Sequence, residues 1–250
     1  MTYCVAISLD AGLIFVSDSR TNAGVDNVST YSKMYRFGID GERQFIILAA
    51  GNLATSQGVI TQVKRDIKKG MQQNLFTMGH IADAADYLGN ISTTVQEKHT
   101  GGGTNYEASF IVGGQIGNNK PSAFLVYPQG NHITTSKDTT YLQIGESKYG
   151  KPILDRILEP ASSLETASLC ALVSMDSTMR SNLTVGPPIE VIVYEKDSMR
   201  LERYYRFEED SEYLRQLKRS WDTNLKEAFN KLPPIAWSGN WDKIKDEKSG

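Results

Sequence analysis

Three residues in the first part of the chain have the types and spacing needed for nucleophilic chemistry. Thr2 follows Met1 and opens a strand-like run over residues 2–8. If Met1 is removed, Thr2 offers a hydroxyl nucleophile and a free α-amine on one residue. An α-amine has a pKa of about 7.7–8.0, so at neutral pH it can accept the proton of the hydroxyl. Asp18 and Lys33 follow at a spacing that strengthens this interpretation.

The two charged residues would have different tasks in this chemistry. A Lys33 ammonium beside the Thr2 hydroxyl would favour the developing alkoxide and lower the pKa of the amine. The Asp18 carboxylate would hold that ammonium in place. Taken singly, Asp18 and Lys33 are better interpreted as an ordinary surface ion pair, worth about 0–1 kcal/mol. Their combination with Thr2, and with Gly51, a glycine between a predicted strand and a predicted helix where a substrate carbonyl could approach the backbone N–H, favours the catalytic interpretation.

Hydrophobic periodicity predicts strands and helices that alternate in groups. The first 50 residues contain short apolar runs between tight glycine turns, which are hairpin signals. At Gly51-Asn52 the period changes, and Asn52 or Thr55 is the predicted cap of a helix that ends near Gly70. The predicted strands are 5–7, 13–16, 33–37, 44–50, 108–112, 123–127, 133–136, 141–144, 189–194 and 201–207, and the other predicted helices are 78–95, 151–158 and 164–179.

This order of elements predicts an α+β fold of four layers. Two sheets packed face to face, with a helix pair outside each, would bury all of the apolar faces. We therefore predict a four-layer αββα sandwich that forms one domain over residues 1–207. Residues 208–250 differ, because an acidic turn is followed by an amphipathic helix through Leu214, Leu217, Trp221 and Leu225. This extension is expected to pack on the same domain or on a neighbouring subunit.

Composition argues against several classes of protein. The net charge is −2, and the basic stretch 64–69 has mixed charge, so neither nucleic acid nor an anionic membrane is an expected partner. No apolar run approaches the roughly 20 residues that cross a bilayer, and no signal peptide is visible. Cys4 and Cys170 lie in apolar runs and are expected to be free thiols, which predicts a cytoplasmic protein.

Two further features give little support to other chemistries. Segment 145–151 imitates a nucleotide-binding P-loop, but Pro152 stands where that motif needs Ser or Thr to bind Mg²⁺. The three histidines lie in none of the motifs that mark zinc sites or serine and cysteine triads. We therefore expect neither a metal nor an organic cofactor.

Four short segments carry a family resemblance, namely residues 2–6, 16–24, 32–34 and 49–52. Together they resemble the β subunits of proteasomes and, most closely, the bacterial Anbu (ancestral beta subunit) family. The similar order of elements extends to Phe207. The resemblance implies a threonine-type, N-terminal-nucleophile peptidase that hydrolyses amide bonds through an acyl ester on Thr2.

The resemblance also implies which residues form the site. Thr2 corresponds to the nucleophile, Asp18 and Lys33 to the catalytic aspartate and lysine, and Gly51 to the oxyanion donor. The implied specificity pocket beside the nucleophile has small and aromatic walls, which suit a small or apolar substrate side chain. Alternatively, the tyrosines of these walls simply pack in the core. The wall residues are Thr21, Tyr31, Tyr35, Ala49 and Leu53.

Support for the amine is the point at which the chain departs from the family pattern. Many proteasome β subunits have a Gly-Ser-Gly segment there, whereas this chain has Gly145-Glu146-Ser147. Either Ser147 takes that part in a shifted register or the support differs, and Ser181 is a second candidate hydroxyl. Asp176 corresponds to a second supporting aspartate, with a helix-end carboxylate as the alternative.

Two other functions stay open at this point. An amidase that acts on a small molecule or an isopeptide-like linkage would use the same nucleophile. A non-catalytic assembly subunit would keep Met1, because a blocked amine cannot act as a base. The resemblance also implies self-assembly into a ring or a helical homo-oligomer, and it leaves an ATPase partner undecided.

Overall fold

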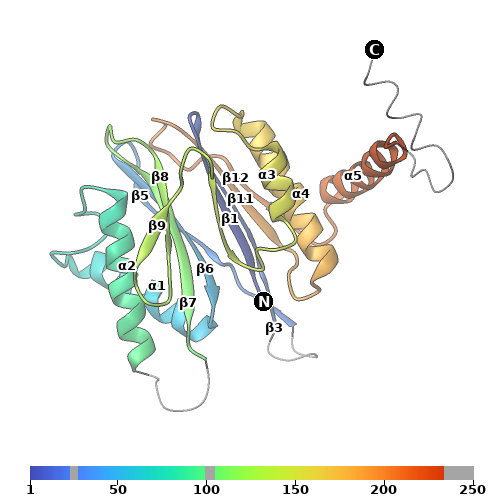
Figure 1. Ribbon diagram of the computed structural model, residues 1–250. Coiled ribbons are helices and arrows are strands. Elements are labelled where there is room, and N and C mark those ends of the chain that lie inside the picture. Colours follow the sequence, from blue (N-terminus) through green and yellow to red (C-terminus); the bar gives the residue numbers. More distant parts are fainter. Residues whose placement is uncertain (23–27, 99–104, 234–250) are drawn as a thin grey trace, which may run out of the picture. The chain divides into compact units, whose positions relative to one another are not determined.

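The structure is a computed structural model, and it describes residues 1–22, 28–98 and 105–233 (Figure 1). The chain forms two compact units, Met1–Ser211 and Glu212–Gly250. The second unit contains α5 (Glu212–Asn230), the amphipathic helix that the sequence predicts. The rest of the predicted 208–250 extension, from residue 234 onward, lies outside the described residues.

The first unit contains two five-stranded antiparallel sheets. One sheet has the strand order β10-β1-β2-β11-β12, and the other has the order β5-β6-β7-β8-β9. The strands of the first sheet are β1 (Tyr3–Leu9), β2 (Gly12–Asp18), β10 (Tyr141–Gly145), β11 (Ile189–Glu195) and β12 (Tyr204–Phe207). The strands of the second sheet are β5 (Met34–Ile39), β6 (Arg43–Gly51), β7 (Ala108–Ile116), β8 (Ser122–Val126) and β9 (His132–Thr134).

The two sheets enclose a shared apolar core. Phe15 of the first sheet and Ile46 and Ile111 of the second are fully buried members of this core. A second core lies between the β5–β9 sheet and the helices α1 (Leu53–Lys69) and α2 (Ile81–Glu97). On the opposite side, α4 (Leu164–Ser181) packs on β1, β2 and β11 and pairs with α3 (Lys151–Ile157). Figure 1 shows the two helix pairs on opposite sides of the sheets, which confirms the predicted αββα sandwich.

Local capping chemistry sets where the helices begin and end. Asn52 caps α1 by accepting a hydrogen bond from the Thr55 amide at 3.1 Å, and the left-handed Gly70 ends it. The second helix begins at Ile81, later than the predicted residue 78, because the Asp83 carboxylate accepts a hydrogen bond from the His80 amide at 2.9 Å.

Two parts of the fold differ from the sequence prediction. β3 (Arg20–Asn22) and β4 (Val28–Thr30) form a separate two-stranded pair that was not predicted. The last strand of the first sheet begins at Tyr204 rather than at residue 201, although Leu201 still packs against the core between the sheets. Among the described residues, no helix combines the length and apolarity that a bilayer crossing requires.

Candidate active site

Thr2 directly precedes β1 and lies on the wall of a pocket of about 390 Å³. Its carbonyl oxygen accepts a hydrogen bond of 2.7 Å from the Glu146 amide. Gly145 makes this approach feasible, because it has a φ of +83° and a Cβ there would lie 2.0 Å from the Thr2 carbonyl oxygen. The pocket is lined by Met1, Thr2, Thr21, Ser32, Lys33, Tyr35, Ala49, Ala50, Gly51, Leu53, Ser56 and Gly145.

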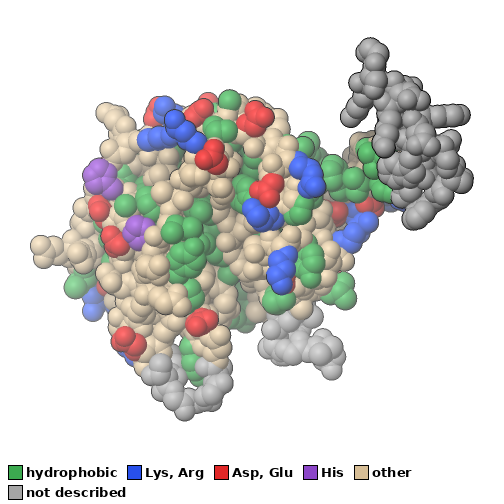
Figure 2. All heavy atoms as spheres, viewed as in Figure 1, with side chains coloured by type: hydrophobic (Ala, Val, Ile, Leu, Met, Phe, Trp, Pro, Cys, Tyr) green, Lys and Arg blue, Asp and Glu red, His purple; other side chains and the backbone are tan. Residues whose placement is uncertain are grey.

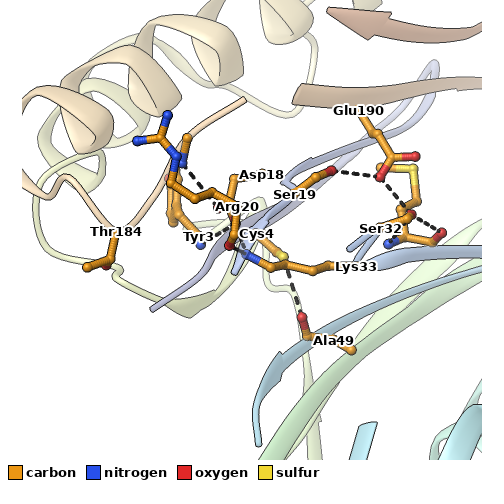
Figure 3. Close-up of polar contacts among 12 residues, drawn as sticks. Tyr3, Cys4, Asp18, Ser19, Arg20, Ser32, Lys33, Ala49, Thr184 and Glu190 are labelled. Carbon is orange, nitrogen blue, oxygen red and sulfur yellow. Dashed lines mark hydrogen bonds and ion pairs between the residues drawn. The ribbon is translucent and has the colours of Figure 1, made fainter. Parts of the chain in front are cut away.

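Lys33 and Asp18 form a buried ion pair at this pocket (Figure 3). Lys33 Nζ lies 2.7 Å from Asp18 Oδ1 and donates a second hydrogen bond of 2.6 Å to the Arg20 carbonyl. Asp18 also accepts hydrogen bonds from the amides of Tyr3 and Gly186, at 3.0 and 3.2 Å. The two charged side chains are 8% and 0% exposed, so the pair is not an ordinary surface ion pair.

Burial and the ion pair shift the pKa values of two groups at the site, the Asp18 carboxyl and the α-amine of the chain. Burial raises the pKa of the Asp18 carboxyl, while the Lys33 ammonium and the two backbone amides act in the opposite direction. The α-amine of the chain belongs to Met1 in this structure, and its pKa is lowered, first by burial and then by the charge of Lys33. A lowered pKa extends the range of pH over which the amine is neutral and can accept a proton.

Gly51 lines the pocket; it is the last residue of β6, and α1 begins two residues later. It has a φ of +106°, and a Cβ there would lie 2.4 Å from the Glu107 carbonyl oxygen, so the position requires glycine. The N-terminus of a helix carries partial positive charge, which favours a negative group nearby. Gly51 is therefore suitably placed to donate its amide to a developing oxyanion.

The structure brings four of the five predicted wall residues to the pocket, namely Thr21, Tyr35, Ala49 and Leu53. Tyr31 is not among the lining residues and is 43% exposed. Thr21 Oγ1 is buried and has no hydrogen-bond partner among the described residues. The pocket thus has mostly apolar walls, and this Thr21 hydroxyl lies beneath its surface.

Ser147 and Asp176 are predicted site residues that do not line the pocket. Ser147 donates its amide to the Gly145 carbonyl at 3.0 Å, in the turn that follows β10. Asp176 is half-buried inside α4 rather than at its end, and Ser181 is the exposed last residue of that helix.

Sequence reasoning missed several residues that shape the site. Ser32, Ser56 and Ala50 line the pocket, and Gly186 and the Arg20 carbonyl complete the surroundings of the ion pair. Backbone groups leave no signal in residue type, so these last two could not be found. Ser32, by contrast, directly precedes the predicted Lys33 and could have been considered with it.

The predicted site residues do not gather at any second cavity among the described residues. A larger cavity of about 720 Å³ lies between α1 and α2 and contains none of them. Within the described ranges, no cluster of three or more His, Cys, Asp or Glu side chains could hold a metal ion. On the face that Figure 2 shows, basic and acidic side chains are interspersed rather than gathered in a single basic patch.

Comparison with solved structures decides the family. Anbu from Yersinia bercovieri has a TM-score of 0.90 and 43% sequence identity, and the match covers 94% of this chain and 100% of that chain. The chain belongs to the Anbu family. The helical assembly of the Anbu complex from Pseudomonas aeruginosa gives a TM-score of 0.90 and 45% identity, again over 94% and 100% of the two chains. The Gly-1 mutant of Anbu from Hyphomicrobium sp. strain MC1 gives 0.89 and 41% over 94% and 99%.

No protein-family model and no curated protein matches the chain. Membership in the Anbu family confirms the predicted fold class, because Anbu has the fold of proteasome β subunits. The family also places the chain among the proteasome-like N-terminal-nucleophile hydrolases.

Proposed function

We propose that the chain is a threonine-type hydrolase that cleaves peptide amide bonds with Thr2 as the nucleophile. One observation supports this most strongly. The buried Lys33 ammonium, held by Asp18 and by the Arg20 carbonyl, lines the same pocket as Thr2 and Gly51. A buried ammonium fixed at a pocket wall is suited to stabilise negative charge on a neighbouring hydroxyl oxygen.

The proposed reaction has two stages. After Met1 is removed, the Thr2 amine takes the hydroxyl proton, and the oxygen attacks the substrate carbonyl carbon. The Gly51 amide donates a hydrogen bond to the resulting oxyanion. The protonated amine then gives its proton to the leaving nitrogen, which leaves an acyl ester on Thr2. In the second stage the amine takes a proton from a water molecule, whose oxygen attacks the ester carbonyl carbon. The protonated amine then returns that proton to the Thr2 oxygen as the acid product departs.

Lys33 contributes charge to this reaction rather than a transferred proton. Its ammonium favours the alkoxide form of Thr2 and lowers the pKa of the neighbouring amine, as its effect on the Met1 amine indicates. Asp18 keeps the ammonium charged and in place. The proposed reaction uses no metal and no organic cofactor.

The walls of the pocket favour a particular kind of substrate side chain. Ala49, Leu53 and the ring of Tyr35 provide a mostly apolar surface, and the Thr21 hydroxyl provides one buried polar group. We therefore expect substrates with a small or apolar side chain before the cleaved bond.

Self-assembly is the second part of the proposal. The related Anbu complex from Pseudomonas aeruginosa forms a helical assembly. We propose that this chain forms a homo-oligomer, either helical or ring-shaped, in the cytoplasm. Two free thiols, Cys4 and Cys170, are consistent with a reducing compartment.

One observation favours a non-catalytic form of the same protein. Met1 itself lines the pocket, and while it is present the amine belongs to Met1 and Thr2 carries an ordinary amide. A form that retains Met1 would act only as an assembly subunit. An amidase for small molecules or isopeptide-like linkages would use the same residues and differ only in what the pocket accepts.

A panel of fluorogenic substrates separates these functions. We expect hydrolysis of peptide amides with small or apolar side chains, complete loss in T2A, and residual activity in T2S, because a serine keeps both a hydroxyl and an amine. T30A, a threonine exposed on β4, is the matched control and is expected to stay active. Cleavage of only small-molecule or isopeptide-like amides would replace the peptidase proposal with the amidase. No cleavage of any substrate by protein lacking Met1 would favour the assembly subunit.

A further inference from the structure

Glu190 is a buried carboxylate with no assigned task in the proposed reaction. It lies on β11, and only 4% of its surface is exposed. Three hydroxyls donate hydrogen bonds to it: Ser32 at 2.7 Å, Ser19 at 3.1 Å and Tyr204 at 2.7 Å. Removing a carboxylate from water is unfavourable unless hydrogen bonds compensate for the lost hydration. The three hydroxyls supply that compensation, and their directions fix the orientation of the Glu190 side chain.

Two of these hydroxyls belong to the two segments that hold Lys33. Ser19 lies between Asp18 and Arg20, which both accept a hydrogen bond from Lys33 Nζ. Ser32 directly precedes Lys33 in the chain. A single carboxylate oxygen, Oε2, accepts from both serines (Figure 3). This atom therefore joins the segment that bonds the ammonium to the segment that carries Lys33, in addition to the backbone hydrogen bond of 2.9 Å from the Tyr31 amide to the Ser19 carbonyl.

We propose that Glu190 is a positioning residue that fixes Lys33 in the pocket by joining segment 18–20 to segment 32–33. This inference rests on the proposed function, in which the location of the Lys33 ammonium matters for the Thr2 hydroxyl. Ser32 also lines the pocket, so the same bonds hold part of the substrate wall. Glu190 itself contacts neither the nucleophile nor the substrate in this scheme.

Two substitutions of Glu190 separate its hydrogen bonds from its bulk. E190L removes both acceptor oxygens at similar size, whereas E190Q keeps one oxygen, and rotating hydroxyls can donate to it. Misplacement of a catalytic group by about 1 Å can lower a rate by about 10²-fold. We therefore expect E190L to lower kcat by about 10- to 100-fold with a smaller change in KM, and E190Q to restore most of kcat. E195L, at the exposed end of the same strand, is the matched control.

A pH profile distinguishes positioning from simple loss of stability. If Lys33 moves away from the amine, its charge lowers the pKa of that amine less, and the acidic limb of kcat/KM moves to higher pH in E190L. Partial unfolding alone would lower the whole profile without moving the limb. If E190L does not fold, S19A/S32A removes the same two bonds from the opposite side and is expected to shift the limb in the same direction.

Hydrogen exchange tests the inference without relying on activity. In the full-length assembly, E190L is expected to raise amide exchange of peptides covering residues 17–22 and 30–35 together, relative to E195L. Unchanged exchange in both peptides, or an unchanged pH limb and kcat in folded E190L, would overturn the positioning role. If E190L raises exchange in both peptides but the wild type hydrolyses no substrate, the Glu190 link between the segments stands and the proposed function is refuted instead.

Discussion

The buried ion pair of Asp18 and Lys33 makes a quantitative prediction about stability. The two charged atoms lie 2.7 Å apart, and neither side chain is more than 8% exposed. At an effective dielectric constant of about 20 their attraction is roughly 6 kcal/mol, part of which offsets the cost of removing both charges from water. D18N leaves the Lys33 ammonium buried without its counter-charge. We therefore expect D18N to lower the free energy of unfolding by about 3–5 kcal/mol.

The design of the assay follows from the sequence. All three tryptophans, Trp221, Trp237 and Trp241, follow residue 211 in the sequence, so none belongs to Met1–Ser211 and tryptophan fluorescence is a poor probe of the unit that holds the ion pair. Urea unfolding followed by far-ultraviolet circular dichroism avoids this problem. The protein concentration must be held constant, because assembly would add to the apparent stability.

Two further variants make the test specific. E202Q removes one partner of the exposed Arg200–Glu202 pair, whose side chains are 61% and 71% exposed, and should change stability by about 0–1 kcal/mol. D18N/K33M removes both buried charges and should be less destabilised than D18N alone. A buried, mutually stabilising pair is contradicted if D18N changes stability as little as E202Q does, or if the double variant loses as much stability as D18N and K33M added together.

Three other predictions address the site. K33M removes the ammonium that opposes the effect of burial on Asp18, so the pKa of this carboxyl rises further in the native state. Above about pH 3.9 the native state of K33M then binds more protons than the unfolded state. Its stability relative to wild type should therefore rise as pH falls from 7.5 to 5, and a flat difference in urea titrations would contradict this. G51A should melt at a lower temperature than wild type and lose activity, because its Cβ would lie 2.4 Å from the Glu107 carbonyl oxygen. G41A, with a φ of +79° and no atom near the new Cβ, should lose only about 1–2 kcal/mol of unfolding free energy. Equal melting temperatures of the two variants would argue against a special requirement for glycine at position 51. The acidic limb of kcat/KM should have its midpoint below the ordinary amine pKa of about 8, because burial and Lys33 lower the pKa of the Met1 amine at this end of the chain. A midpoint above 8 would contradict a lowered pKa of the catalytic amine.

Much of the fold was predictable because local signals and global packing agree. Asn52 begins α1 as a side-chain cap and Gly70 ends it in a left-handed conformation, and both residue types are typical at these positions. The tight turns around Gly12 and Gly41 mark hairpins. The β3–β4 pair was not predictable in this way. Each of its strands has three residues, and neither shows the alternation that identifies a half-buried strand.

The site was predictable only where residue type carries the signal. Thr2, Lys33 and Gly51 were identified from chemistry and resemblance, and the structure places all three at one pocket. Glu190 was missed because Ile189-Glu190-Val191 alternates apolar and polar residues, which suggests a solvent-facing carboxylate. In the structure both faces of β11 are covered, so the same residue is buried.

Whether Thr2 is an N-terminal nucleophile can be measured by intact mass after incubation with a peptide epoxyketone. This reagent needs both a hydroxyl and a free α-amine on one residue to form its adduct. We predict a mass that lacks Met1 and carries one adduct in the wild type, and no adduct in T2A. A protein that retains Met1 and forms no adduct would contradict the claim for this form and leave the chain as an assembly subunit.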